Sequence, residues 1–508
     1  MNGILEQNVL AIKQLQVGMD AAQLGNFLRT RHVMLALTDS APAHVVALNT
    51  AINLLSRLSF EVSVTATEQV LGDSLVTQAV AEARRLGFDR VDQKNDHSQH
   101  LTIAIGAEPL PGAGLRGYAS GWNICVTDKT ARGESIKTSN ALCGAMLGVL
   151  ITSEAFNLTV GSVLGKNGSP REISVSLLDY SSTISGESAE LPEVIIPHAT
   201  LIGCGAVGNA FVYALSVLPD VSGRLDVVDP DWFTKTNVHR YMLARLADVK
   251  TERIYKTQRA KEVLRHHHLF EVVGYEKNFN DFLNDDCDER RIPFLISAVD
   301  STGKRRDLGR ETPLKAINAS TGNFTLALTT HYEAYKLDGP CVGCHYPPRS
   351  AEQERFVLIA RETGLPVNQV QELSNTNAKV TSKLLAIVAA FRGVPLQDYA
   401  EYEGQPFDSF YQHGVCGGTE VQTATGKAEI PLAHVSAAAG ILLACELVKR
   451  VTPSLEKYSL NNFLQLDLLN LTSAWFRQRK DARGGCDCRR DVYQRRFISK
   501  YQDLSRRI

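Results

Sequence analysis

The residues with the clearest chemical potential follow a glycine-rich turn near the middle of the chain. Gly203, Gly205 and Gly208 stand at the spacing G-x-G-x-x-G directly after the apolar run ATLI, and Asp229 ends the next apolar run, RLDVVD. Glycines in such a turn let backbone N–H groups approach a phosphate, and the N-terminus of the following helix favours an anion. A carboxylate about 20 residues further on can accept hydrogen bonds from ribose hydroxyls. The stretch therefore predicts a strand, a turn, a helix and a second strand that bind a nucleotide.

Further polar residues around this unit suit ATP better than NAD. They are Asp231, Asn237, Arg240, Lys256 and Asp300, the last of which ends the apolar run FLISAVD. Cations close to the glycine turn would neutralise a triphosphate and its leaving pyrophosphate. Carboxylates at strand ends can hold Mg²⁺ against phosphate oxygens. An NAD site needs only a neutralised pyrophosphate, so the set as a whole favours ATP, although each residue by itself could be an ordinary surface charge.

These motifs resemble those of the ubiquitin-activating enzyme superfamily, which includes the ThiF and MoeB adenylyltransferases. The resemblance rests on GCGAVGNAF, VVDPDWFTKTNVHRYML, the later lysine and AVDSTGKRR, and it covers Val194 to about Arg450. It implies that Asp229, in a D-x-D motif with Asp231, holds the ribose and that Asp300 positions Mg²⁺. The residues implied to contact the phosphates are Asn237, Arg240 and Lys256. The implied reaction has the C-terminal carboxylate of a protein attack the α-phosphate of ATP, giving an acyl-adenylate and pyrophosphate.

Two close pairs of cysteines offer a metal site. Cys341 and Cys344 form C-x-x-C in GPCVGCHYPP, and Cys486 and Cys488 form C-x-C in GGCDCRR. Two such pairs that meet in the fold can give a closed tetrahedral Zn²⁺ site of the structural kind. Many members of the resembled superfamily carry a zinc ion at the corresponding place. We therefore expect these four residues to bind zinc, with free thiols as the alternative.

A further cysteine, Cys416 in YQHGVCGGTE, is a candidate nucleophile. Its position resembles the crossover loop in which activating enzymes carry their acceptor cysteine. The resemblance implies that its thiolate attacks the acyl-adenylate to give a thioester and AMP, with His413 close enough in sequence to help ionise the thiol. The alternative is a loop cysteine without a role, since some adenylating relatives need none. The predicted catalytic residues are thus Cys416, Arg240, Lys256 and Asp300.

The strands and helices that position these residues alternate along the sequence, and this alternation predicts an α/β fold. The chain has 508 residues, which corresponds to roughly three domains of about 150 residues. Strands predicted from RHVMLALTD, HLTIAIG and WNICVTDK alternate with helices predicted from APAHVVALNTAINLLSRL and SNALCGAMLGVLITSEAFN. We expect a Rossmann-like adenylation domain of the ThiF and MoeB type, preceded by a degenerate α/β domain and interrupted by a helical insertion. The predicted divisions are 1–182 for an inactive adenylation-like domain, 183–193 for a linker, 194–344 for the active ATP-binding domain, 345–415 for the helical insertion, and 416–508 for the acceptor-cysteine loop, the return to the adenylation domain and the zinc-binding tail.

The first α/β domain is expected not to bind ATP. Its strand–helix turn reads TDSAPA, with no glycine to let the backbone approach a phosphate. Activating enzymes pair one inactive with one active adenylation domain, so the resemblance implies that this half is the inactive partner, fused in one chain. Homodimeric relatives lend an arginine across their interface to the ATP, and Arg29 or Arg31 could serve here.

Composition bounds the remaining function classes. The formal net charge is −1, so nothing indicates nucleic acid or an anionic membrane as a partner. The start MNGILEQNVLAIKQLQ lacks the features of a signal peptide, and the apolar run ALCGAMLGVLIT is too short by itself to span a bilayer. Ten cysteines without a secretory signal favour a reducing compartment. The predicted location is therefore the cytoplasm.

The function predicted is activation of a ubiquitin-like protein by C-terminal adenylation, followed by a thioester on Cys416 and transfer to a conjugating enzyme. ATP, Mg²⁺ and Zn²⁺ are the expected cofactors, and a homo-oligomer is possible. The pairing of two halves in one chain resembles prokaryotic ubiquitin-like systems, some of which serve antiviral defence, and this resemblance implies the same role here. The first alternative is activation of a sulfur-carrier protein, as in ThiF and MoeB. The second is a docking protein of the same fold without catalysis.

Overall fold

The structure, a computed structural model, describes most of the chain. The described residues are 2–13, 19–67, 72–93, 101–128, 140–164, 170–182, 191–249, 253–322, 325–332, 340–346, 351–376, 378–392, 394–411, 415, 422–423, 426–427, 431–460, 463–468, 472–476 and 486–505. The chain forms two compact units, Met1–Tyr346 with Ile430–Ile508, and Pro347–Glu429.

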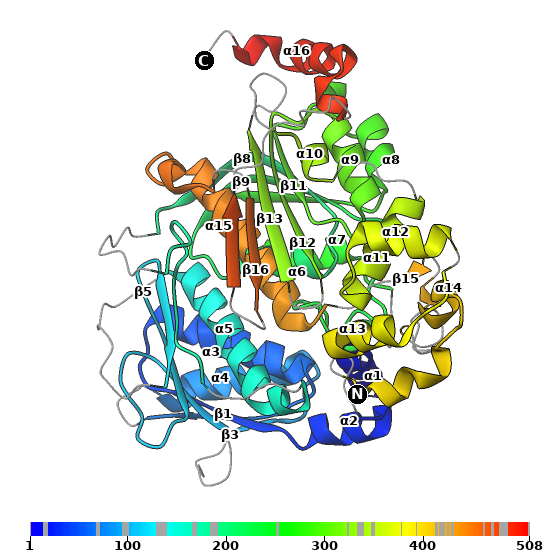
Figure 1. The fold of residues 1–508 in the computed structure, drawn as a ribbon. Coiled ribbons are helices and arrows are strands. Elements are labelled where there is room, and N and C mark those ends of the chain that lie inside the picture. Colours follow the sequence, from blue (N-terminus) through cyan, green and yellow to red (C-terminus); the bar gives the residue numbers. More distant parts are fainter. Residues whose placement is uncertain are drawn as a thin grey trace. The chain divides into compact units, whose positions relative to one another are not determined.

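The first part of the larger unit is built on a seven-stranded sheet (Figure 1). Its strands are β1 (His32–Leu37), β2 (Glu61–Ala66), β3 (Val91–Gln93), β4 (Leu101–Ile105), β5 (Leu115–Ser120), β6 (Asn123–Thr127) and β7 (Ile173–Ser176), in the order β3-β2-β1-β4-β5-β6-β7. Its helices are α1 (Asn2–Lys13), α2 (Ala21–Arg29), α3 (Pro42–Arg57), α4 (Gly72–Arg85), α5 (Ala141–Val160) and the short η1 (Gly161–Leu164). After its first residue, His32, the central strand β1 is a continuous apolar run, VMLAL, as expected for a strand of a parallel sheet that is covered on both faces.

The second part of the larger unit is built on an eight-stranded sheet. Its strands are β8 (Val194–Ile202), β9 (Val221–Val228), β10 (Phe270–Tyr275), β11 (Phe294–Ser297), β12 (Lys315–Thr321), β13 (Thr325–Tyr332), β16 (Phe463–Asp467) and β17 (Thr472–Phe476), in the order β10-β9-β8-β11-β12-β13-β16-β17. Its helices are α6 (Ala206–Ser216), η2 (Ala247–Val249), α7 (Lys256–Leu264), α8 (Phe279–Asp285), η3 (Asp288–Arg290), α9 (Thr302–Arg310), α10 (Val342–His345), α15 (Ala433–Val451), η6 (Glu456–Tyr458), η7 (Asp487–Arg489) and α16 (Asp491–Ser505).

The two sheets share one plan. In each, the first strand pairs in parallel with the second strand on one side and the fourth on the other. Strands three and five extend the sheet in parallel, and the next two strands, β6 and β7 in one sheet and β13 and β16 in the other, add antiparallel pairs. β17 is a further antiparallel strand beside β16. The predicted α/β fold class is confirmed, and the first five strands of each sheet pair in parallel.

Four helices join the two sheets through one apolar layer. α3 packs against α5, α6 against α15, and α5 against α15. α5 and α15 are buried over almost their whole lengths. A helix that is apolar all round must be covered on all sides, which explains why the longest apolar helices lie at the centre of this layer.

One described helix, α5, is long and apolar enough to cross a membrane. It covers 20 residues, because the helix continues beyond the run ALCGAMLGVLIT that was judged too short. In this fold 94% of its most apolar window is buried against other parts of the protein.

The smaller unit is mainly helical. Its elements are α11 (Ala351–Thr363), α12 (Val367–Asn375), α13 (Ser382–Arg392), η4 (Leu396–Tyr402), α14 (Phe407–Phe410), β14 (Gln422–Thr423) and β15 (Gly426–Lys427). The helices enclose a small core of their own in which Ile359, Val370, Val388, Phe407 and Phe410 are fully buried.

Candidate functional site

The glycine-rich turn joins β8 to α6. Gly203 has a φ of +90°, which favours glycine, and a Cβ there would lie 2.9 Å from the carbonyl oxygen of Ala298. A Cβ on Gly208 would lie 2.1 Å from the carbonyl oxygen of Gly203, so this glycine lets α6 pack against the turn. Gly205 differs, since its φ is −69° and a Cβ there would meet Tyr241 Oη at 3.6 Å, an ordinary contact. Apart from Gly205 and its two chain neighbours, no other described residue has an atom within 4 Å of that point, so Gly205 leaves space in front of the helix.

The N-terminus of α6 is suited to bind an anion. Gly205 is the N-cap of the helix, and no side-chain hydrogen bond caps it. The first N–H groups of a helix lack partners inside the helix and carry partial positive charge. An uncapped, glycine-lined helix start is the geometry that receives a phosphate in nucleotide-binding folds.

A buried lysine joins two carboxylates beside the turn. Asp229 follows β9 directly, is 5% exposed, and accepts N–H groups from Cys204 (2.6 Å) and Asp231 (2.9 Å). Lys256, the first residue of α7, is 4% exposed. Its Nζ lies 2.8 Å from Asp231 Oδ2 and 3.3 Å from Asp229 Oδ1. The structure thus brings together the D-x-D motif, the glycine turn and the lysine predicted on the following helix.

The charges of this group depend on one another. Burial disfavours the Lys256 ammonium, but Tyr241 and the two aspartates around it raise its pKa above the ordinary value for lysine. Burial raises the pKa of Asp229, although Lys256 and the backbone N–H groups oppose this. The side chain of Asp231 is 68% exposed, so Asp231 is the carboxylate of the pair that a ligand would reach from solvent.

Asn237 and Arg240 lie on the segment between β9 and α7. Asn237 Oδ1 accepts the N–H of Thr234 at 3.1 Å, and its carbonyl oxygen accepts the N–H of Arg240 at 3.1 Å. Arg240 is half-buried, and its Nε is buried with no hydrogen-bond partner in the described part of the chain. Its guanidinium carbon lies 6.0 Å from the ring centroid of Tyr241, and Lys256 Nζ lies 5.7 Å from the same centroid. The buried ring of Tyr241 therefore lies close to both predicted phosphate ligands, Arg240 and Lys256. No sequence motif had indicated this residue.

Asp300 stands at the end of the neighbouring strand, β11. Its side chain is 83% exposed, and Oδ1 accepts a hydrogen bond from Lys304 at 3.0 Å. Partial desolvation would raise the pKa of Asp300, but the hydrogen bond and charge of Lys304 lower it below the ordinary value. β8 pairs with β9 on one side and with β11 on the other. The glycine turn, Asp229 and Asp300 therefore follow three adjacent parallel strands, at the switch point where open α/β sheets bind their ligands.

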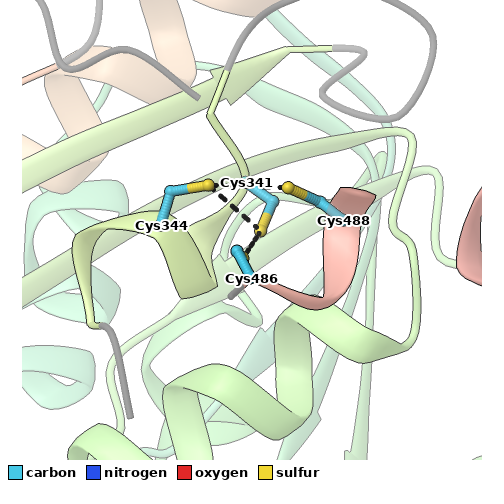
Figure 2. Close-up of side chains that lie close together, drawn as sticks. All are labelled: Cys341, Cys344, Cys486 and Cys488. Carbon is cyan, nitrogen blue, oxygen red and sulfur yellow. Dashed lines mark hydrogen bonds between the residues drawn. The ribbon is translucent and has the colours of Figure 1, made fainter. Parts of the chain in front are cut away.

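The four predicted metal-ligating cysteines lie together (Figure 2). The Sγ atom of Cys341 lies 3.9 Å from that of Cys344 and 3.4 Å from that of Cys486, and the Sγ atoms of Cys344 and Cys488 are 3.5 Å apart. All four Sγ atoms lie within 4.8 Å of one another, and all four residues are buried. Zn–S bonds of about 2.3 Å in a tetrahedron place sulfur atoms about 3.8 Å apart. The cluster is thus compatible with zinc.

The cysteine cluster also ties the end of the chain to the second sheet. Phe497 and Tyr501 of α16 pack on the cluster. Tyr501 Oη donates to the carbonyl oxygen of Ile292 at 3.0 Å, just before β11, and Arg310 Nε donates to Asp487 Oδ2 at 2.6 Å. The cluster therefore lies at a junction between elements far apart in sequence, where a structural metal is useful.

Comparison with known proteins places the second sheet in a family. The model of the ThiF family matches residues 196–489, which include the glycine turn, the polar set and the cysteine cluster. The chain belongs to the ThiF family. The resemblance to the ubiquitin-activating enzyme superfamily is thereby confirmed at the level of the family, whose fold is that of nucleotide-binding adenylyltransferases.

The individual proteins to which this ThiF-family chain is similar share less than 30% of its sequence. The chain is 28% identical over 407 residues to the uncharacterized protein y4jF of Sinorhizobium fredii, a match that covers 76% of this chain and 75% of that protein. Among solved structures, it is similar to E. coli MccB, with 14% identity, a TM-score of 0.35, and coverage of 75% of this chain and 96% of that one. The structure of E. coli MccB with ATP gives 16% identity and a TM-score of 0.34, and the match covers 57% of this chain and 66% of that one.

The predicted acceptor cysteine of this ThiF-family protein is not among the described residues. Cys416 and its neighbour His413 both lie outside them. The thioester role of Cys416 therefore stays a prediction from the sequence.

The corresponding turn of the first sheet carries an acid in place of glycine. Between β1 and α3, Asp39 accepts the N–H of Ala41 at 3.0 Å and that of Ala107 at 2.7 Å. His44 Nδ1 lies 2.5 Å from Asp39 Oδ1, and His44 Nε2 accepts the N–H of Ala119 at 3.0 Å. Although desolvation would raise the pKa of Asp39, His44 and the two backbone N–H groups lower it. A negative charge thus stands at the turn of the first sheet, whereas the turn of the second sheet leaves open space at Gly205.

Proposed function

We propose that this protein uses ATP to adenylate the C-terminal carboxylate of a ubiquitin-like protein. The observation that carries the proposal is the group of charges around the open start of α6. Lys256 links Asp229 and Asp231 beside the glycine turn, Arg240 lies nearby with no carboxylate partner among the described residues, and Asp300 follows the adjacent strand. A pyrophosphate alone does not require such a set, whereas a triphosphate that loses pyrophosphate does.

The proposed chemistry uses these residues to orient ATP and to stabilise charge. An oxygen of the C-terminal carboxylate bonds to the α-phosphorus, and the bond from that phosphorus to the bridging oxygen breaks, releasing pyrophosphate. The N–H groups at the start of α6, together with Arg240 and Lys256, would stabilise the negative charge that develops on the phosphates. Asn237 would donate to the same phosphates, and Asp231, the exposed acid of the D-x-D motif, would share the ribose with Asp229.

Asp300 fits a role as a Mg²⁺ ligand. Its carboxylate is exposed and ionised, and Lys304 engages one of its two oxygens. Carboxylate oxygen is the donor that Mg²⁺ prefers, and Mg²⁺ usually keeps several waters and phosphate oxygens besides one or two protein ligands. When bound, Mg²⁺ would supply charge neutralisation for the triphosphate. The cysteine cluster fits Zn²⁺ in a structural role, since it is closed and buried.

The second half of the proposed reaction uses Cys416. Its thiolate would attack the acyl carbon of the adenylate, form a thioester and release AMP, and the thioester would then pass to the thiol of a conjugating enzyme. The glycines that flank Cys416 in GVCGG support this choice, because a nucleophile that must travel to the adenylate needs a pliable loop. The unit 347–429 and the large first domain exceed what a compact sulfur-carrier enzyme requires, which favours the ubiquitin-like substrate.

We also propose that the first domain is the inactive partner of the adenylation domain. The two sheets share their strand order, so the chain contains within itself the pairing that other members of the superfamily form between subunits. Asp39 would repel a phosphate at the turn after β1. The cytoplasm is the proposed location, and neither nucleic acid nor a membrane is a proposed partner.

Detection of a thioester between Cys416 and a ubiquitin-like protein would test the proposed function. The purified protein and a Cys416→Ala variant are incubated with Mg²⁺-ATP and candidate ubiquitin-like proteins, and the products are compared on reducing and non-reducing gels. We expect an adduct that thiols remove, on the unmodified protein only. Pyrophosphate exchange without any adduct would keep adenylation but assign the protein to sulfur-carrier activation. Binding of the partner without any ATP turnover would instead indicate a docking protein.

A further inference from the structure

A buried arginine of the first domain holds the backbone of the proposed nucleotide site. Arg57, the last residue of α3, is 0% exposed. Its Nη1 donates to the carbonyl oxygen of Val238, and its Nη2 donates to the carbonyl oxygens of Met242 (2.8 Å) and Ala244 (3.0 Å). Its Nε donates to Asn53 Oδ1 at 2.6 Å. One side chain of the first domain thus binds three carbonyl groups of the second.

The bound carbonyls flank the predicted phosphate ligands. Residues 237–244 follow Asp229 and Asp231 in the chain, begin with Asn237 and include Arg240. Val238, Met242 and Ala244 are buried, so their carbonyl groups cannot be hydrated and need protein donors.

Neighbouring contacts extend this interface. Asn53 Nδ2 donates to the Met242 carbonyl at 3.1 Å, and the N–H of Leu246 donates to the carbonyl of Leu86 at 3.0 Å. The guanidinium carbon of Arg57 lies 5.1 Å from the ring centroid of Phe88. Hydrogen bonds with the first domain therefore hold this segment at several points between Val238 and Leu246.

We propose that Arg57 is a positioning residue for ATP binding, which holds residues 237–244 so that Asn237 and Arg240 are fixed before the nucleotide arrives. The inference rests on the proposed function of the site. It gives the first domain, which lacks a glycine turn of its own, a part in nucleotide binding without any contact to the nucleotide. It also differs from the arginine expected to reach ATP directly, for which Arg29 and Arg31 were considered.

The choice of arginine follows from the geometry. Its planar fork presents five N–H donors in fixed directions, so one group can serve three carbonyl oxygens and Asn53 together. A lysine would offer a single nitrogen and could not span the same carbonyls. Burial lowers the pKa of Arg57 to about 9, while the charge of Asp248 opposes this. Arg57 is therefore a cation at neutral pH.

The test compares substitutions on the same helix. Arg57→Met removes the donors, and Arg57→Lys keeps the charge without the fork. Asn53→Ala, a milder change, removes the acceptor that orients Arg57 and one donor to the Met242 carbonyl. Thr50→Val is the control, because Thr50 makes a different contact to the second domain, a 2.7 Å hydrogen bond to Tyr213 Oη. Each full-length protein is measured for hydrogen exchange at residues 238–244 and for the Kd of Mg²⁺-ATP.

We expect Arg57→Met to speed exchange at 238–244 more than at β11, and to weaken Mg²⁺-ATP binding by about tenfold to a hundredfold. Arg57→Lys should not restore the affinity, Asn53→Ala should show a smaller change in the same direction, and Thr50→Val should show neither. If Arg57→Met does not fold, Asn53→Ala carries the test. Exchange at 238–244 that is unchanged, or accelerated without loss of affinity, overturns the inference. An unmodified protein that does not bind Mg²⁺-ATP overturns the proposed function itself, whatever the exchange shows.

Discussion

Substitution of Gly205 by alanine separates binding of phosphate from stability of the turn. The backbone at Gly205 has a φ of −69°, which alanine adopts freely, and the added methyl would meet only Tyr241 Oη among the described atoms, at 3.6 Å. Alanine is a poorer N-cap than glycine but also reduces the entropy of the unfolded chain. These effects oppose each other, so the free energy of unfolding should change by less than about 1 kcal/mol.

The same methyl should weaken the binding of ATP. It would occupy the space in front of α6 that a phosphate needs, and so would cost one charge-assisted hydrogen bond from the helix start. Such a bond contributes about 1.5–3 kcal/mol, which corresponds to roughly a tenfold to hundredfold rise in the Kd of Mg²⁺-ATP. Gly208→Ala is the matched comparison, since its methyl would lie 2.1 Å from the Gly203 carbonyl oxygen. That clash should destabilise the protein by about 1–3 kcal/mol.

Calorimetric titration with Mg²⁺-ATP and urea denaturation measure the two quantities separately. Gly205→Ala should bind weakly and unfold like the unmodified protein, whereas Gly208→Ala should be impaired in both. Unchanged ATP affinity in Gly205→Ala would show that phosphate does not approach this turn. A loss of stability as large as that of Gly208→Ala would show that our reading of the turn geometry is wrong.

Two further predictions concern pH and metal. Burial, together with the charges of Arg240 and Arg57, lowers the pKa of His239 to about 3; the unfolded chain takes up this proton near pH 6.5, so stability is lost as the pH falls below that value. This histidine alone should reduce the free energy of unfolding by about 1.4 kcal/mol between pH 7.5 and pH 5.5. In urea denaturation, His239→Asn should lack that part of the pH dependence. An identical pH dependence in both proteins would contradict the prediction. Elemental analysis should find one zinc ion per chain in the unmodified protein and none in Cys488→Ala. The variant should also have a lower melting temperature and faster proteolysis of α16. Absence of zinc from the unmodified protein, or an unchanged melting temperature in the variant, would contradict the zinc site.

The parts of the site that are close in sequence could be predicted from it. The glycine spacing, Asp229 at the strand end and the lysine on the next helix are local signals, because a strand–turn–helix–strand unit fixes where its ends lie. The grouping of Cys341 with Cys486, 145 residues apart, could be predicted from residue type, since cysteine pairs indicate a shared metal. The structure brings these residues together, and their roles stay predictions.

Other features depend on contacts that leave no local pattern. Arg57 and Met242 are 185 residues apart in the sequence. From sequence alone, a single arginine at the end of a helix is expected to lie on the surface. The separate roles of Gly203 and Gly205 follow only from the space around each, because the spacing does not distinguish these two glycines. Helix α5 was predicted as far as Asn157 and ends at Val160, but the burial of its more polar second half, ITSEAFNLTV, depends on packing with neighbouring helices.

Exchange of radiolabelled pyrophosphate into ATP tests whether the protein adenylates a C-terminal carboxylate. The assay contains the protein, Mg²⁺-ATP and a candidate ubiquitin-like protein, with the same ubiquitin-like protein carrying an amidated C-terminus as the control. Our account predicts that label enters ATP only with the free carboxylate and that Asp300→Ala abolishes the exchange. Exchange that persists with the amidated protein, or that is undiminished in Asp300→Ala, would contradict adenylation of a C-terminal carboxylate at this site.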